Sequence, residues 1–305
     1  MQNASGDYHF KSISQLMRFL DYPMPPHPLV ALVNYQQVPM AVFEKGKKIS
    51  LDFYKISFKD KFNGQVRYGQ GYYDFEDGGL AFLKPNQIVI SSDLPESNEG
   101  YVLYFHPDLI RNYRLAHAID QYGFFSYDVS EALFLSAKEK ETISGLFHTI
   151  ANELENNIDQ FSQDVLVSQL ELLLNYSNRF YNRQFITRKN VNHEIIDKLD
   201  QLLETYFNEK NGITMGLPSV KYASMELKLS QRYLSDMLRS LTGYNTQQYI
   251  QDKVIEHSKK ILSSTLLSVA EVAYQLGFEH PQSFSKLFKV KTTLSPLAFR
   301  RSFEQ

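Results

Sequence analysis

The spacing of hydrophobic residues changes character about one third of the way along the chain. Up to about Phe105, short apolar runs alternate with polar positions, as in 49–58, and the turn-forming sequences DGG and PNQ separate such runs within 71–91. Alternation of this kind is typical of β-strands, and several short strands in succession predict a sandwich or a small barrel. We therefore expect β-structure over 28–106.

Beyond this point, apolar residues recur every three or four positions, which indicates amphipathic helices. The clearest example is the stripe along 162–181, and helical patterns continue after His193. A polar and basic tract, QFITRKNVN, lies between the two helical regions and marks a boundary. The predicted organisation is a first domain over 1–183 with strands in 28–106 and helices in 107–183, a linker over 184–192, and an all-helical domain over 193–305.

Near the C-terminus, the stretch 269–289 contains two short helical patterns around one glycine. Val269, Val272 and Leu276 fall on one helix face, and Gly277 then supplies the positive φ that ends a helix at low cost. A second apolar stripe follows, in which Phe284 and Phe288 point inward. The pattern predicts a helix, a tight turn and a second helix.

This pattern occurs twice, because 219–239 overlays the later stretch at an offset of 49 residues that rises to 50 after the turn. Internal repetition of this kind indicates two equivalent structural units. A helical pattern over 246–263 joins them and would hold them at a fixed separation. The predicted core positions of the two units are Leu227, Leu234, Leu238, Ala273, Leu276, Gly277, Phe284 and Phe288.

The outer faces of the second helices carry polar and basic side chains. Such a face describes either a helix-turn-helix reader, whose second helix enters the DNA major groove, or an ordinary corner between two solvated helices. For a reader, Arg pairs with guanine and Gln with adenine. The base-contact candidates are Arg232, Ser235, Gln282, Ser285 and Lys286, and the phosphate-contact candidates are Gln231, Arg239 and Lys289. We expect Asp236, on the same face, to pair with a basic neighbour rather than with cytosine.

The distribution of charge along the chain favours the DNA-binding helix-turn-helix over the solvated corner. The chain of 305 residues has a net charge of −2, but residues 212–305 hold 12 Lys and Arg against 7 Asp and Glu, a net of +5. The remaining 20 basic and 27 acidic residues give 1–211 a net charge of −7. A basic tail behind an acidic front is typical of proteins whose tail binds a polyanion.

Composition narrows the other possibilities. The chain has no cysteine, no apolar run long enough to span a membrane, and no export signal in MQNASGDYHF, so we expect a cytoplasmic protein without a membrane partner. Histidines are scattered without ligand-like spacing, and neither a phosphate-binding loop nor a GxSxG motif is present. We therefore expect no metal, no cofactor and no enzyme activity.

From Ile195 onward the sequence closely resembles the AraC/XylS family of transcription regulators. The resemblance rests on LSQRYLSDMLRSLTGYN, VAEVAYQLGF and FSKLFK…SPLAFR, which stand where that family has its motifs. It implies two helix-turn-helix units joined by a helix, which bind operators in double-stranded promoter DNA, with activation as the mode of regulation and RNA polymerase as a second partner. Two positions depart from the family: Thr293 replaces the usual glycine, so we expect the second reading helix to end differently, and His280 replaces a better N-cap residue.

The first domain resembles, more loosely, the cupin-like jelly rolls that precede this tail in many family members. An aromatic pocket for an unidentified small-molecule effector would use Tyr54, Tyr72, Phe82 and Tyr104, or these rings simply fill the core. The leucine stripe of 162–181 either forms a homodimer or packs on the sandwich.

The fold class predicted is α+β, with a cupin-like β-sandwich, trailing helices and an all-α C-terminal domain. The function predicted is sequence-specific regulation of transcription through two recognition helices in successive major grooves. Two other functions stay open. One is a protein-interaction or assembly module without specific DNA recognition, and the other is a cupin enzyme fused to a DNA-targeting tail.

Overall fold

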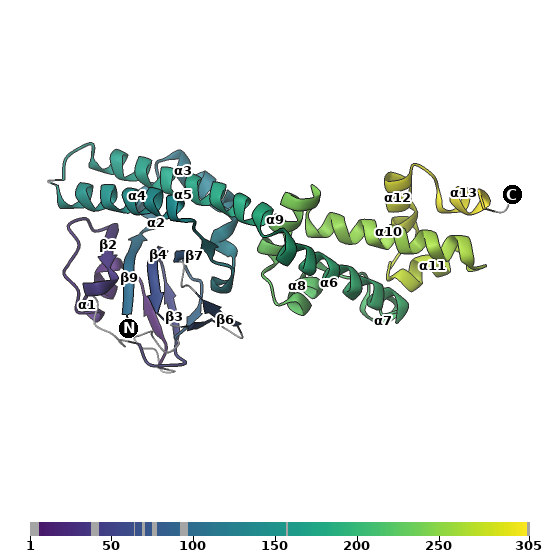
Figure 1. The fold of residues 1–305 in the computed structure, drawn as a ribbon. Coiled ribbons are helices and arrows are strands. Elements are labelled where there is room, and N and C mark those ends of the chain that lie inside the picture. The colour runs from purple at the N-terminus through teal and green to yellow at the C-terminus, as the bar shows by residue number, and fades with distance from the viewer. Residues whose placement is uncertain are drawn as a thin grey trace. The chain divides into compact units, whose positions relative to one another are not determined.

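The computed structural model of the chain divides into two compact units, residues 1–184 and 185–305. The structure describes residues 6–303 with the exception of 38–42, 64, 69–70, 75–77, 92–96 and 157. The first unit combines sheets with helices and the second is helical, which confirms the α+β class (Figure 1).

Among the residues that the structure describes in the first unit, the strands form three sheets. The three-stranded sheet has the order β1 (Tyr8–Phe10), β3 (Lys48–Leu51) and β8 (Val89–Ile90). The five-stranded sheet has the order β10 (Leu133–Phe134), β7 (Gly79–Leu83), β4 (Tyr54–Asn63), β9 (Ser97–Phe105) and β2 (Val30–Asn34). A two-stranded ribbon pairs β5 (Gln65–Tyr68) with β6 (Gly71–Asp74). Strand β1, which lies before the predicted β-region, pairs in parallel with β3.

Helices follow where the apolar spacing predicts them. Those of the first unit are α1 (Ile13–Phe19), α2 (Pro107–Ile110), α3 (Arg114–Ala118), α4 (Ala137–Glu155) and α5 (Ser162–Thr187). The leucine stripe of α5 is buried within the chain, with Leu166, Leu170 and Leu173 at most 4% exposed. Of the two alternatives for this stripe, the structure therefore favours packing within the unit.

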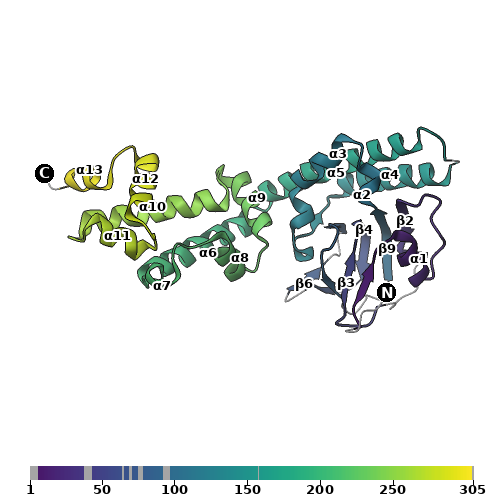
Figure 2. The same cartoon turned by 180° about the vertical axis from the view of Figure 1, so that it is seen from behind.

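Helices α4 and α5 run side by side over the sheets in both views (Figures 1 and 2). Residues that alternate along β4 point to opposite faces of the sheet, and one of these faces meets the helices. The Phe58 ring stacks on Phe147 of α4 at 5.5 Å, and the Phe82 ring lies 6.2 Å from that of Tyr181 in α5. The other face of the sheet meets the three-stranded sheet.

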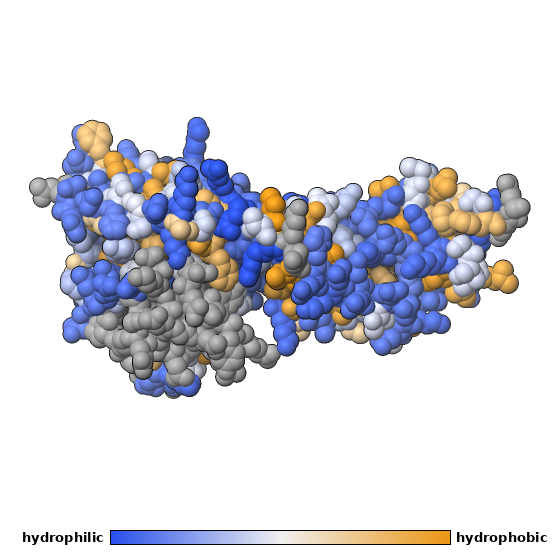
Figure 3. All heavy atoms as spheres, in the orientation of Figure 1, coloured by the Kyte–Doolittle hydropathy of each residue, from blue (hydrophilic) through white to orange (hydrophobic). Residues whose placement is uncertain are grey.

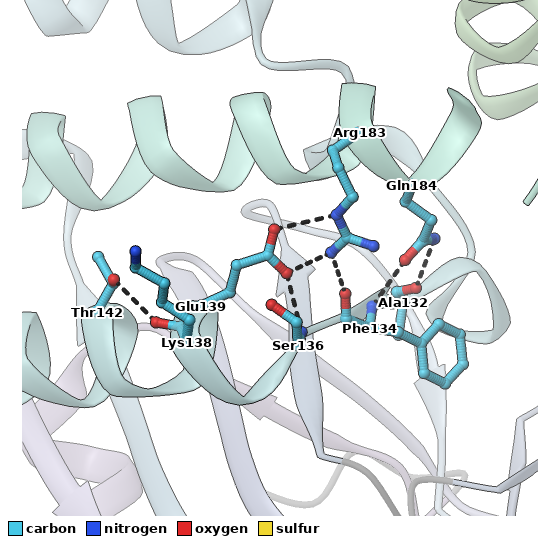
Figure 4. A network of polar contacts seen from close by, with 8 residues as sticks. All are labelled: Ala132, Phe134, Ser136, Lys138, Glu139, Thr142, Arg183 and Gln184. Carbon is cyan, nitrogen blue, oxygen red and sulfur yellow. Dashed lines mark hydrogen bonds and ion pairs between the residues drawn. The ribbon is translucent and has the colours of Figure 1, made fainter. Parts of the chain in front are cut away.

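A polar network fastens the end of α5 to the segment before α4 (Figure 4). Arg183 donates from Nε to Glu139 at 3.0 Å and from Nη2 to the Phe134 carbonyl at 2.8 Å. Gln184, which is 1% exposed, accepts from the Phe134 amide at 2.8 Å and donates to the Ala132 carbonyl at 3.3 Å. These contacts satisfy the edge of β10 that does not pair with β7, and they fix the end of α5.

The tract predicted as a linker over 184–192 is helical instead. Helix α5 continues to Thr187, and α6 (Lys189–Asn208) begins two residues later. Although the tract 184–192 is mostly polar, two of its residues, Phe185 and Asn192, are buried, each 2% exposed. The Asn192 side chain donates to the Phe185 carbonyl at 2.7 Å, which stabilises the junction between the helices.

The second unit is built from short helices around the long α10, which corresponds to the joining helix predicted over 246–263. The helices after α6 are α7 (Gly212–Met215), α8 (Val220–Leu227), α9 (Gln231–Thr242), α10 (Thr246–Ser264), α11 (Val269–Leu276), α12 (Pro281–Thr292) and α13 (Pro296–Arg301). Helices α9 and α12 lie toward opposite ends of α10 (Figure 1).

Gly277 has two structural roles. Its φ of +96° ends α11 in the left-handed conformation, as the sequence predicts. In addition, a Cβ at this position would lie 2.3 Å from the carbonyl carbon of Gly216, so the backbone after α7 packs directly against it. Both requirements favour glycine over any residue with a side chain.

Candidate nucleic-acid interface

The first helix-turn-helix unit consists of α8, a short turn and α9. Helix α8 ends at Lys228 in the left-handed conformation, and the Leu229 amide donates back to the Ser224 carbonyl at 3.0 Å. Ser230 then caps α9, its Oγ accepting from the Tyr233 amide at 3.2 Å. A serine N-cap and a left-handed C-cap are the usual ends of short helices, so the local sequence defines this turn.

The second unit, α11 to α12, has the same construction with different caps. Ser268 and Glu271 form a capping box at the start of α11, with hydrogen bonds of 3.2 Å and 2.7 Å. Helix α12 begins with Pro281 at its first position, and the His280 side chain makes no capping hydrogen bond. Proline at this position costs no hydrogen bond, because the first amides of a helix have no partner within it.

Helices α9 and α12 are equivalent in length and in how they end. Each has 12 residues, and each ends at a left-handed residue whose amide donates to the carbonyl four residues earlier. Thr242 Oγ1 donates to the Leu238 carbonyl at 2.7 Å, and Thr292 Oγ1 donates to the Phe288 carbonyl at 2.8 Å. The repeat in the sequence is thus a repeat in backbone and hydrogen bonding.

Thr293 does not change the end of α12. It adopts φ +66°, the same region as Gly243 at +82° at the end of α9. The expectation that the second reading helix ends differently was therefore wrong. A β-branched residue is strained in this region of φ and ψ. Helix α12 therefore ends as α9 does, although its last turn contains a strained residue.

The predicted cores of the two units are largely buried. Seven of the eight predicted positions, all except the turn glycine, have side chains that pack inward. Leu227 is the least buried of these, because its side chain is only half-buried. The buried positions, each at most 1% exposed, are Leu234, Leu238, Ala273, Leu276, Phe284 and Phe288.

The predicted contact residues on the outer faces are mostly exposed. On α9 these are Gln231, Arg232 and Arg239, and on α12 they are Gln282, Lys286 and Lys289. The view in Figure 3 shows a largely hydrophilic surface over the C-terminal helices, with smaller hydrophobic areas toward the chain end. Each helix therefore offers hydrogen-bonding and cationic groups to the solvent.

Asp236 lies between the two arginines of α9. Its carboxylate accepts from Arg232 Nε at 2.9 Å and pairs with Arg239 Nη1 at 3.4 Å, and its side chain is 17% exposed. Of the two roles considered for Asp236, the structure shows the pairing with basic neighbours. These pairs hold the arginines along the helix surface.

Two predicted serines are less accessible than the other candidates. The hydroxyl of Ser235 hydrogen-bonds to that of Thr246 at 2.9 Å, and Thr246 is fully buried at the start of α10. Ser285 is half-buried. Helical spacing places both serines near the outer face, but spacing alone does not reveal that α10 covers one of them.

Sequence reasoning missed Ser283, which is exposed in the first turn of α12. Its counterpart in the repeat, Tyr233, is 7% exposed, and its ring lies 5.3 Å from that of Phe185. The repeat alignment contained the signal, because a hydroxyl residue replaces a buried aromatic one at the same position. The start of α12 therefore exposes a hydrogen-bonding group at a position where the start of α9 buries an aromatic ring.

The aromatic pocket predicted in the first unit is only partly formed as expected. Tyr104 lines a pocket between the sheets, but Tyr54 and Phe82 lie on the opposite face. Tyr54 stacks on Phe105 at 4.7 Å, so both rings fill the core beneath the helices. The Tyr72 side chain lies outside the part of the chain that the structure describes.

Among the described residues, no group of three His, Cys, Asp or Glu side chains is arranged to hold a metal ion. No helix within the described ranges combines the length and the apolar character needed to cross a membrane.

Parts of this chain are similar to known proteins. The family described as a helix-turn-helix domain matches residues 224–302. Histidine kinase P4 of Formosa agariphila is 25% identical over 45% of this chain and 10% of its own length. The uncharacterized HTH-type transcriptional regulator YisR of Bacillus subtilis is 30% identical over 32% of each chain. Among solved structures, the C-terminal domain of the response regulator yesN from Fusobacterium nucleatum is 30% identical, with a TM-score of 0.28 over 33% of this chain and 95% of that one.

The matched residues and the paired geometry define the second unit as a helix-turn-helix domain. It contains two such units joined by α10. The matches with the first curated relatives, however, span only 10%, 32% and 36% of their lengths.

Proposed function

We propose that the protein regulates transcription by binding specific double-stranded DNA operators, with α9 and α12 in successive major grooves. The observation that carries this proposal is the equivalence of the two helices, which share their length, a left-handed C-terminal end and an exposed polar face around one connecting helix. A major groove admits one α-helix, and two helices about 34 Å apart fit two grooves on one side of the duplex. The net charge of +5 over residues 212–305 favours binding to the phosphate backbone.

Position along each helix suggests which residues read bases. Arg232 and Gln282 lie in the first turns, the part of a recognition helix that usually meets base edges. Arg239 and Lys289 lie two turns further on and suit phosphate contacts, which fix register but carry no sequence information. Lys286 and Ser283 complete the candidates on α12.

The resemblance to AraC/XylS regulators supports three finer proposals. We infer that the protein acts in the cytoplasm, where its DNA is, and that it activates transcription with RNA polymerase as a second partner. A homodimer remains part of this proposal, although the leucine stripe of α5 does not supply its interface. Transcription in vitro from a promoter that carries the selected operator would test activation directly.

The central test compares two substitutions on one operator selected with the full-length protein. Arg232→Ala should lose about 1–3 kcal/mol of discrimination at one base pair and leave binding to scrambled DNA nearly unchanged. Lys289→Ala should weaken binding to both duplexes and lower the salt slope by about 1. Lys260→Ala, at an exposed lysine of α10 that is not among the predicted contact residues, is the matched control.

The outcomes separate the proposed function from its alternative. If Arg232→Ala lowers the affinity for operator and for scrambled DNA equally, Arg232 makes no base contact. If selection yields no preferred sequence at moderate salt, the assembly-module function takes the place of the one proposed.

A further inference from the structure

A lysine at the end of α12 contacts elements that lie outside its own helix-turn-helix unit. Lys291 is in the last turn of α12, and its Nζ lies 2.6 Å from a carboxylate oxygen of Asp252 on α10. The same Nζ lies 5.7 Å from the centre of the Tyr244 ring, in the turn between α9 and α10. One side chain of α12 therefore contacts both the connecting helix and the turn that follows α9.

The turn that contains Tyr244 is itself fixed to the end of α9. The Tyr244 amide donates to Thr242 Oγ1 at 3.2 Å, and that hydroxyl donates to the Leu238 carbonyl at 2.7 Å. Asn245 then caps the start of α10 with its side chain. A short path of contacts thus runs from the last turn of α12, through Lys291 and Tyr244, to the end of α9.

The helix-turn-helix unit itself does not require a lysine at this position. At the offset of 50 that relates the two reading helices, Lys291 corresponds to Leu241 and Asp252 to Ser302. Helix α9 nevertheless has the same length as α12 and the same left-handed end. An ion pair that the repeat does not need for its own fold indicates a role between the two units.

The contacts of Lys291 give direction to packing that is otherwise apolar. Phe284 and Phe288 bury α12 against its neighbours, but apolar packing is not directional. A hydrogen-bonded pair of cation and carboxylate is short and depends on geometry. The Lys291 and Asp252 side chains are 23% and 35% exposed, so solvent screens the pair only in part. Rotation of α12 against α10 would separate them.

We propose that Lys291 is a positioning residue, which fixes the direction of α12 relative to α9 so that both reading helices meet the duplex at one spacing. Asp252 and Tyr244 are its partners. The effect on operators rests on the proposed DNA-binding function, whereas the orientation of the two helices can be measured without DNA. A lysine that only stabilised the fold would not affect the preference for one spacing.

The first experiment compares the affinity of the full-length protein for a selected operator with that for derivatives in which one base pair is inserted or removed between the half-sites. One base pair rotates a half-site by about 35° and moves it by about 3.4 Å, so a fixed pair of helices cannot meet both half-sites of a derivative fully. We expect the unaltered protein to prefer the operator over each derivative by at least about tenfold.

Substitutions test whether this preference depends on the ion pair. Lys291→Met and Asp252→Asn should each lower the preference at least about threefold, and the double variant should lower it no further than either alone. Lys291→Arg keeps a cation for the same carboxylate and ring and should retain the preference. Lys260→Met, at an exposed lysine of α10, is the matched control for the loss of charge and should leave the preference unchanged.

The second experiment measures the orientation of the helices without DNA. The chain has no cysteine, so Gln231→Cys in α9 and Ser283→Cys in α12, both at exposed positions, allow paired spin labelling of the full-length protein. Electron paramagnetic resonance should give a narrow distribution of distances between the labels. Lys291→Met and Asp252→Asn should each broaden it, and circular dichroism checks that the variants are folded. Asp252→Asn hardly changes shape and carries the test if Lys291→Met does not fold.

Lys291 has no positioning role if the distribution stays narrow in the folded variants. The same conclusion follows if Lys291→Met weakens binding to operator and derivatives by one common factor while Asp252→Asn strengthens binding to all of them, because Lys291 then contacts phosphate directly. If the unaltered protein selects no operator, the proposed DNA-binding function fails, and the distance distributions still decide whether Lys291 positions α12.

Discussion

Replacing Asp236 by Asn tests whether the outer face of α9 meets DNA, because it changes charge but hardly changes shape. The carboxylate pairs with Arg232 at 2.9 Å and with Arg239 at 3.4 Å. Without the negative charge, both guanidinium groups are released toward the solvent, and the net charge of the face rises by one. On a surface that binds DNA, such a change should strengthen binding rather than weaken it.

The magnitude of each effect follows from these contacts. Exposed ion pairs within a helix are worth about 0.3–0.5 kcal/mol each, so the loss of two pairs should lower the unfolding free energy by no more than about 1 kcal/mol. Each additional phosphate contact steepens the dependence of log K on log salt by about 0.9. We expect the slope to steepen by the amount that corresponds to about one to two additional phosphate contacts. The affinity for scrambled DNA should rise more than that for the operator, since phosphate contacts carry no sequence information.

The assay is fluorescence anisotropy of full-length protein on operator and scrambled duplexes over a range of salt concentrations, with thermal unfolding measured separately. Glu256→Gln is the matched control, because it removes one carboxylate that pairs with Lys253 at 3.6 Å on α10. Weaker binding or a shallower slope for Asp236→Asn would show that the two arginines gain no phosphate contacts. In that case Asp236 accepts from a base or α9 does not face the duplex.

Three further predictions concern stability. Thr293→Gly should raise the unfolding free energy by about 1 kcal/mol in thermal melts, because it relieves a left-handed β-branched residue. Arg183→Met should lower it by about 1–3 kcal/mol by removing the hydrogen bonds to Glu139 and to the Phe134 carbonyl, whereas Arg179→Met, at an exposed position, should have little effect in the same assay. Burial lowers the pKa of Lys55 to about 8 and, together with the nearby charge of Lys55, lowers the pKa of Lys59 to about 7, so the unfolded chain binds more protons above about pH 7 than the folded chain does. Stability of the first unit should therefore rise with pH from about 7 toward the ordinary lysine pKa near 10.4, and replacing both lysines by Met should flatten this rise.

Each of these predictions has an outcome that contradicts it. Gly243→Thr should cost about what Thr293→Gly gains, so a neutral result for both would mean that the left-handed cap carries no strain. If Arg183→Met and Arg179→Met lower the unfolding free energy equally, the network of Figure 4 does not stabilise the fold. Stability that falls between pH 7 and 9 in the first unit would contradict the burial of the two lysines.

The repeated unit could be predicted from the sequence because its signals are local. Ser230 and Ser268 directly precede apolar helical runs, Gly277 and Gly243 follow them, and the spacing of the apolar residues defines both cores. Capping and periodicity involve residues within a few positions of one another, so they are visible in one sequence. The equivalence of α9 and α12 follows from them.

Other features depend on contacts between distant segments and could not be predicted. Thr246 buries the hydroxyl of Ser235 only because α10 packs on α9. The same holds for the linker, where a polar composition conceals the buried Phe185. The lysines of β4 alternate like solvent-facing residues, and only the pairing of the sheets shows that they face inward.

Methylation interference on a selected operator tests whether α9 and α12 enter neighbouring major grooves. We expect two clusters of sensitive purines about 10 base pairs apart on one side of the duplex. Arg232→Ala should remove sensitivity within one cluster and Gln282→Ala within the other. A single cluster, or the loss of the same cluster in both variants, would mean that the two helices do not occupy neighbouring grooves.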